Sequence, residues 1–141
     1  MATERYFRVG PRFWTDSMVR PWDDATKLAA MYVLTCEHRI TEGLFRLPLL
    51  YAAHDLDWTT ERVEASFKVL ANDGFMLWDR AVDVVLIVNA LRWQPPAATN
   101  NRKHAVKAIR DLPQTDLLYD FMKLADRHAP EFAKELREAF S

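Results

Sequence analysis

The segment 100–110 contains no acidic residue and four basic residues, which are Arg102, Lys103, Lys107 and Arg110. At helical spacing they lie on one broad face, and Asn100 or Asn101 can cap the start of such a helix. Lysine and arginine on one face neutralise the phosphates of a nucleic acid, and the free amides of a helix N-terminus add a phosphate site. The same pattern also fits a solvated amphipathic helix whose Val106 and Ile109 pack inward.

A second set of candidate side chains lies on the helix predicted to begin after Thr59, a residue type that caps helices well. Its buried face is predicted from apolar residues at helical spacing: Val63, Phe67 and Leu70. The opposite side carries the candidates for contact with DNA bases and phosphates: Thr60, Arg62, Ser66 and Lys68. Glu61 and Glu64 share that side and repel phosphates, so a scaffold or a protein-binding face is the alternative.

A hairpin is predicted to follow this helix. Asn72-Asp73-Gly74 ends the helix, and the segments 75–78 and 84–88 are short runs rich in aromatic and β-branched residues. The polar segment 79–83 joins them. Arg80 at its tip is placed to reach a DNA minor groove or backbone, although a single loop arginine also fits a solvated turn.

Residues suited to catalysis or metal binding are sparse. The three glycines, Gly10, Gly43 and Gly74, lie far apart and form no phosphate-binding loop. The four histidines are dispersed, and no His-x-x-x-His or Cys-x-x-Cys pair occurs. Cys36 is the only cysteine, so we expect no internal disulfide and a small, half-buried side chain at a helix end. The sequence therefore predicts no enzymatic activity, no metal and no cofactor.

Composition indicates one globular domain with room for a helical appendage. The chain has 141 residues, half of them apolar, and a formal net charge of −1, so it is no general polycation. The longest apolar run, 84–88, is far too short to span a bilayer, and no apolar signal segment follows Met1. We expect a soluble, cytoplasmic protein without a membrane partner.

The elements that would position the candidate residues follow a clear order. An aromatic N-terminal segment with Trp14 and Trp22 is predicted to pack over the core, although its arginines also suit stacking on nucleic-acid bases: Arg5, Arg8, Arg12 and Arg20. A helix from Asp23 or Asp24 to about Thr35 comes next. A strand, two helices and two strands then follow, over 43–46, 48–55, 60–73, 75–78 and 84–88. This is the order of a winged helix-turn-helix, in the class of mainly α proteins with a small β-sheet (α+β), and the strand 43–46 can pair with the hairpin.

The organisation predicted from these elements has three parts: a winged helix-turn-helix domain over 1–94, a proline-containing linker over 95–99 and a C-terminal helical extension over 100–141. Within the extension, Pro113 ends the first helix, Thr115 or Asp116 opens the second, and Pro130 begins the last. An apolar stripe on the last helix can dock on the parent domain, a second copy or a protein partner: Phe132, Leu136 and Phe140.

Several of these segments together resemble a known family. They are the run Phe13-Trp14-Thr15-Asp16, the helix ending near Leu34-Thr35, the strand Gly43-Leu44-Phe45-Arg46, the helix beginning at Leu47-Pro48, the helix 63–74 with its wing, and the exit Val88-Asn89-Ala90-Leu91-Arg92-Trp93-Gln94-Pro95. Over residues 6–96 the chain resembles the N-terminal winged-helix domain of phage replication-initiation proteins, the replisome organisers and DnaD-like initiators. The resemblance implies binding to origin DNA. In larger members a separate C-terminal domain helps to load a helicase, and the segment after the linker is short for such a domain.

The sequence thus predicts a DNA-binding winged-helix protein of phage-type replication initiation or gene regulation. The alternative is a protein-interaction module that acts on host or phage replication or transcription machinery, since winged helices also serve as assembly platforms. The acidic residues on the predicted recognition helix favour that alternative. A homodimer or a replication or transcription protein would then meet the C-terminal helices.

Overall fold

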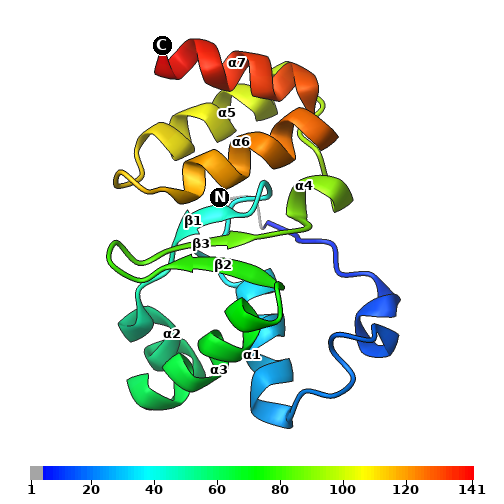
Figure 1. The fold of residues 1–141 in the computed structure, drawn as a ribbon, viewed down its shortest axis with the longest axis vertical. Coiled ribbons are helices and arrows are strands. Elements are labelled where there is room, and N and C mark those ends of the chain that lie inside the picture. The colour runs from blue at the N-terminus through cyan, green and yellow to red at the C-terminus, as the bar shows by residue number, and fades with distance from the viewer. Residues whose placement is uncertain (1–4) are drawn as a thin grey trace.

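The computed structural model describes residues 5–141 and consists mainly of helices around a small sheet (Figure 1). A 3₁₀ helix, η1, covers Pro11–Thr15. The helices are α1 (Asp24–Thr35), α2 (Leu49–Leu56), α3 (Thr60–Asn72), α4 (Ala90–Trp93), α5 (Thr99–Arg110), α6 (Leu117–His128) and α7 (Pro130–Phe140), and the strands are β1 (Leu44–Arg46), β2 (Met76–Asp79) and β3 (Val84–Ile87). The predicted α+β class and the predicted order of elements through β3 are confirmed. Within the described residues, no helix has the length and apolar character needed to cross a membrane.

The antiparallel sheet has β3 at its centre, with β1 on one side and β2 on the other. Leu44 of β1 and Leu77 of β2 both lie opposite Leu86 of β3. The predicted pairing of the first strand with the later hairpin is therefore confirmed. Gly43, just before β1, has a φ of +89°, and a Cβ atom there would lie 2.5 Å from the Cβ of Ala90, so this position requires glycine.

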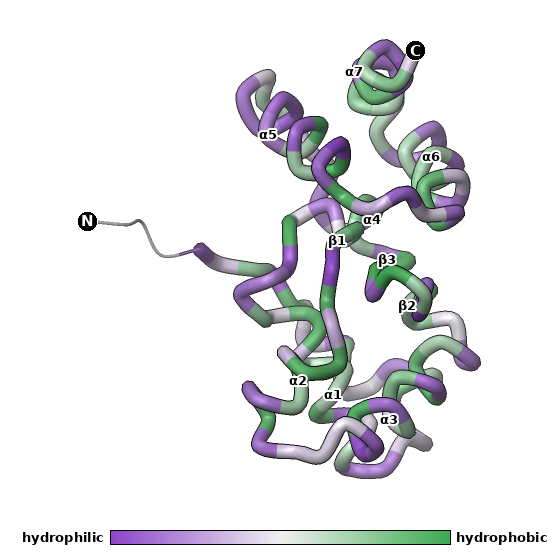
Figure 2. Tube along the Cα trace, turned by 90° about the vertical axis from the view of Figure 1, so that its left-hand side faces the viewer, coloured by the Kyte–Doolittle hydropathy of each residue, from purple (hydrophilic) through white to green (hydrophobic). Residues whose placement is uncertain are grey.

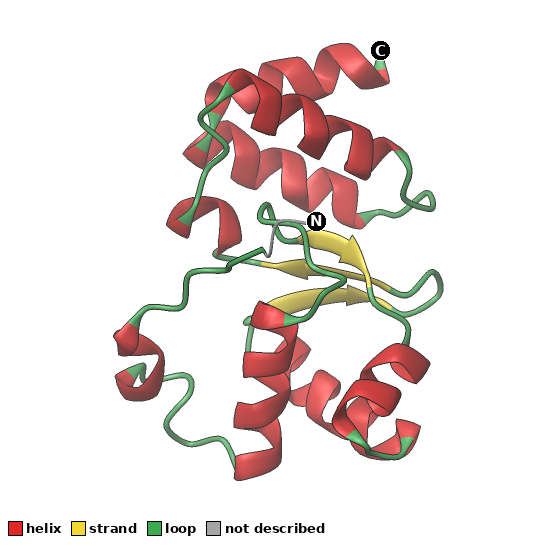
Figure 3. Cartoon of the chain, turned by 180° about the vertical axis from the view of Figure 1, so that it is seen from behind, coloured by secondary structure: helices red, strands yellow, loops and turns green. Residues whose placement is uncertain are grey.

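Helices cover both faces of the sheet, and all four residues of β3 are buried. Val85 and Ile87 belong to a core that they share with α1, α2 and α3. Val84 and Leu86 belong to a second core, shared with α5, α6 and α7. Figure 3 shows the same layers from behind, with the strands between the two groups of helices. Because successive side chains of a strand point to opposite faces, each helical layer packs on its own half of β3.

Trp22 anchors the aromatic N-terminal segment. Its side chain is 7% exposed, and its indole Nε1 donates a hydrogen bond of 2.7 Å to the carboxylate of Asp73 at the end of α3. The ring also meets Phe75 edge to face, at 5.7 Å between centroids. The predicted packing of this segment is confirmed for Trp22, whereas Trp14 is 58% exposed.

Helix boundaries follow the predicted local signals in most places. Asp23 caps α1, and Thr59 caps α3 by accepting a hydrogen bond from the amide of Arg62. The helical turn α4 follows β3 directly, and residues 6–9 form no strand.

Arg39 is a buried cation that sequence analysis did not identify. Its side chain is 1% exposed, and its guanidinium donates hydrogen bonds to the backbone carbonyls of Leu34 at 2.7 Å and of Ile40 and Thr41 at 3.3 Å. The ring of Phe7 lies 4.7 Å away. Burial lowers the pKa of Arg39 to about 10, because a low-dielectric interior disfavours the charged form. Arg39 thus joins the end of α1 to the loop that leads into β1.

Arg39→Met is expected to lower the free energy of unfolding by about 2–3 kcal/mol, because it leaves buried carbonyl groups without their donor. Urea denaturation followed by circular dichroism measures this loss. Arg20→Met is the matched control, since Arg20 is exposed and its replacement should change stability by less than about 0.5 kcal/mol. Equal stability of the two variants would contradict the structural role of Arg39.

Phe132→Ala tests whether the two helical layers unfold together. Phe132 is fully buried in the second core and meets Phe121 edge to face, so truncation should cost about 3–4 kcal/mol. All five tryptophans lie between residues 14 and 93, so their fluorescence reports only on the part of the chain before α5. We expect fluorescence and far-ultraviolet circular dichroism to shift together in urea.

The control for this experiment is Phe140→Ala, on the same helix but 47% exposed, which should leave both curves nearly unchanged. A circular dichroism transition that moves while the tryptophan transition stays in place would show that the second core unfolds independently of the first.

Candidate nucleic-acid interface

Helix α5 carries the basic segment singled out from the sequence. It begins at Thr99 after Ala98, and no side chain caps it, so the predicted cap by Asn100 or Asn101 is wrong. Ala105 and Ile109 are buried, and α5 packs against α7. Figure 2 shows the helix coloured largely as hydrophilic, with its apolar positions interspersed. One side of α5 is therefore fixed to the second core, and the rest faces solvent.

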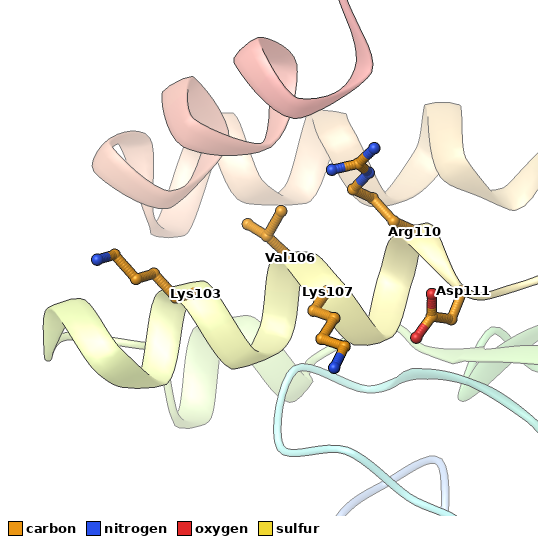
Figure 4. A pocket seen from close by; sticks show the side chains of 5 residues that line it. All are labelled: Lys103, Val106, Lys107, Arg110 and Asp111. Carbon is orange, nitrogen blue, oxygen red and sulfur yellow. The ribbon is translucent and has the colours of Figure 1, made fainter.

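Three of the predicted cations lie together on that solvent side. Lys103, Lys107 and Arg110 are exposed and spread around the half-buried Val106 (Figure 4). With Asp111 they line a shallow concavity of about 340 Å³. Within residues 5–141, none of the three cations forms an ion pair. Their charges are free to meet an anionic ligand.

Arg102 is engaged elsewhere and does not join this group. Its Nε lies 3.0 Å from a carboxylate oxygen of Glu135 on α7, and only 16% of the side chain is exposed. Its guanidinium also donates to the carbonyl of Ala97 and to the hydroxyl of Thr99. Arg102 therefore ties α5 to α7 and to the segment before α5, and the predicted face of four cations reduces to three.

On α3, the prediction that Ser66 faces outward is wrong. Ser66 is 4% exposed, because it lies three residues after Val63 and four before Leu70 and so shares their inward face. Thr60 is half-buried in the first turn. Arg62 is exposed, with its guanidinium carbon 4.1 Å from the ring centroid of Trp58. Fewer of the side chains predicted to face outward on α3 are therefore available to contact DNA.

Glu64 forms ion pairs with the two other cations on this side and offsets part of their charge. Its carboxylate forms an ion pair with Arg80 in the β2–β3 turn and lies 3.5 Å from the Nζ of Lys68. The hairpin also contacts the segment before α6, because the hydroxyl of Thr115 donates a hydrogen bond of 2.6 Å to the carboxylate of Asp79. The turn is therefore fixed between α3 and the segment before α6.

The sheet separates the two groups of predicted site residues. α3 and the ion-paired turn lie with α1 and α2 on one face, whereas α5 lies in the helical layer on the other (Figure 1). The structure brings together Lys103, Lys107 and Arg110. It does not bring Thr60, Arg62, Lys68 and Arg80 onto the same surface as those three.

Titratable side chains also meet where α1 ends near α2. The hydroxyl of Tyr32 donates a hydrogen bond of 2.6 Å to Asp55, whose carboxylate lies 3.5 Å from Nε2 of His38. Burial and this hydrogen bond raise the pKa of the Tyr32 hydroxyl, and burial raises the pKa of the Cys36 thiol. Both groups stay protonated at neutral pH, so the arrangement offers no activated nucleophile. Between residues 5 and 141, no three His, Cys, Asp or Glu side chains come close enough to hold a metal ion.

Sequence analysis missed Arg92 and Trp93 as candidate ligand-contacting residues. Both are exposed on α4, and both line a groove against the N-terminal segment. The signal was present, since an arginine beside a tryptophan suits contact with nucleic acid. It was overlooked because a helical turn of four residues is too short to reveal which side chains face outward.

Comparisons of the chain with models of known protein families, with curated proteins and with solved structures found no match.

Arg102→Gln should lower the free energy of unfolding by about 1–2 kcal/mol, because it removes a partly buried ion pair and two further hydrogen bonds. Lys103→Gln, at the next position but exposed, should change stability by less than about 0.5 kcal/mol. Urea denaturation of both variants measures the difference. A destabilisation no larger for Arg102→Gln than for Lys103→Gln would refute the role assigned to Arg102.

Proposed function

We propose that this chain is a winged-helix protein that binds DNA, with a role in phage-type replication initiation or in gene regulation. The order α1-β1-α2-α3-β2-β3 and the sheet order β1-β3-β2 support the winged-helix assignment. In this scheme α2 and α3 form the helix-turn-helix, and the turn between β2 and β3 is the wing. The resemblance to replisome organisers and DnaD-like initiators supports the replication role.

The observation that carries the proposal is the set of unpaired cations on α5. Lys103, Lys107 and Arg110 are exposed, lie around one concavity and have no carboxylate partner within residues 5–141. By contrast, Lys68 and Arg80 next to α3 both form ion pairs with Glu64, which offsets part of their charge. We therefore assign the principal contact with DNA phosphates to α5. The helix-turn-helix surface then has a secondary part in binding.

The number of free cations sets the expected salt dependence. Each phosphate neutralised on duplex DNA adds about −0.9 to the slope of log K against log salt. Three contacts by Lys103, Lys107 and Arg110 give a slope of about −2.7. A fourth contact by Arg102 would bring the slope to about −3.6, and the ion pair of Arg102 with Glu135 opposes that contact.

Fluorescence anisotropy with a random-sequence duplex of about 20 base pairs, titrated with salt, tests the proposal. The double variant Lys103→Glu, Lys107→Glu is expected to lose about tenfold or more in affinity at low salt, because it replaces two attractive charges with two repulsive ones. The control is Lys123→Glu, Lys134→Glu, which makes the same charge change at exposed lysines on α6 and α7. Equal losses in both double variants would show that net charge, and not the α5 surface, controls binding.

A protein-interaction module is the second candidate function. It is favoured by the ion-paired cations beside α3 and by exposed aromatic side chains on the C-terminal helices, Tyr119 at 74% and Phe140 at 47%. Absence of duplex affinity at low salt would favour this candidate over DNA binding. Truncation after Pro113 does not separate the two candidates, because it would remove α6 and α7 and expose Val84 and Leu86.

A further inference from the structure

A groove of about 640 Å³ lies between the N-terminal segment, α4 and the first core. Its apolar floor includes Val19, Leu34 and Phe75, which are all more than nine-tenths buried. The half-buried Phe13 also lines it. Trp93 of α4 completes the lining with 47% of its surface exposed. Such a volume falls within the range of about 300–1,000 Å³ found for ligand sites.

Positive charge surrounds this apolar floor. Arg8, Arg12 and Arg92 line the groove, are exposed, and form no ion pair with any residue from 5 to 141. Asp16 is the acidic residue of the described lining, and its carboxylate accepts a hydrogen bond of 2.7 Å from the amide of Met18. Three guanidinium groups against one carboxylate favour an anionic ligand with a flat apolar part.

We propose that this groove binds single-stranded DNA, with a base stacked on Trp93 and phosphates held by Arg8, Arg12 and Arg92. Aromatic side chains stack on any unpaired base, and guanidinium groups match phosphate geometry with paired donors. The inference rests on the proposed function in that the ligand is again DNA. It goes further by assigning a separate site to the unpaired strand.

The lining favours a single strand over a duplex, because the bases of a duplex are stacked on one another and their faces are closed to Trp93. An acidic peptide would satisfy the arginines but would make no specific use of an exposed indole beside an apolar floor. The groove is also close in sequence to the proposed duplex surface, since residues 94–98 lead from α4 directly into α5. The two sites can therefore serve a strand that separates from a duplex.

The experiment uses the full chain and a fluorescein-labelled oligothymidylate of about 12 nucleotides, which does not pair with itself. Trp93→Ala is expected to weaken binding of the oligothymidylate by about 10- to 100-fold and to leave duplex affinity unchanged. Arg12→Ala should reduce the salt slope for the single strand by about 0.7, because one phosphate contact is lost. Tyr119→Ala is the control, since Tyr119 on α6 is 74% exposed and does not line the groove.

Failure of this proposal is distinguishable from failure of the proposed duplex binding. Lys103→Glu, Lys107→Glu should weaken duplex binding while Trp93→Ala weakens binding of the single strand. No binding of oligothymidylate by the native chain overturns the groove assignment, whatever the duplex does. Equal losses in Trp93→Ala and Tyr119→Ala also overturn it. So does equal competition by polyglutamate, because charge alone would then account for binding.

Discussion

Burial of β3 on both faces is the constraint on which the rest of this structure depends. A strand of four residues supplies Val85 and Ile87 to one core and Val84 and Leu86 to the other. Removing either helical layer would expose half of the strand to water, at a cost of about 25 cal/mol for each square ångström of apolar surface. The C-terminal helices are therefore packed on the same sheet as the N-terminal layer, and the position of α5 is set by that packing.

Ion pairing decides which cations of a nearly neutral chain remain available. Glu135 holds Arg102, and Glu64 holds Lys68 and Arg80. Among the cations without an ion pair in the described residues, two groups line a concavity or groove, one on α5 and one beside α4. A formal net charge of −1 is thus compatible with local basic surfaces, because the acidic residues are concentrated elsewhere.

The local signals of the sequence predicted the elements well where each signal acts over a few residues. Thr59 caps α3, Gly74 adopts the φ of +81° suited to ending a helix, and the segments around the polar turn pair as a hairpin. The assignment of Ser66 failed because its polar type suggested an outward position while its spacing from Val63 and Leu70 placed it inside. Residue type and periodicity disagreed there, and periodicity determined the position.

The sequence by itself determined the order and approximate limits of the strands and of the longer helices, the α+β class and the existence of a basic α5, because stops and periodicity are local properties. Only the tertiary structure decided which cations are free of ion pairs, that β3 is covered on both faces, and that Arg92 and Trp93 line one groove with Arg8 and Arg12. The physical reason is distance along the chain. Arg102 meets Glu135 across 33 residues and Trp22 meets Asp73 across 51, and no spacing within one element encodes such contacts.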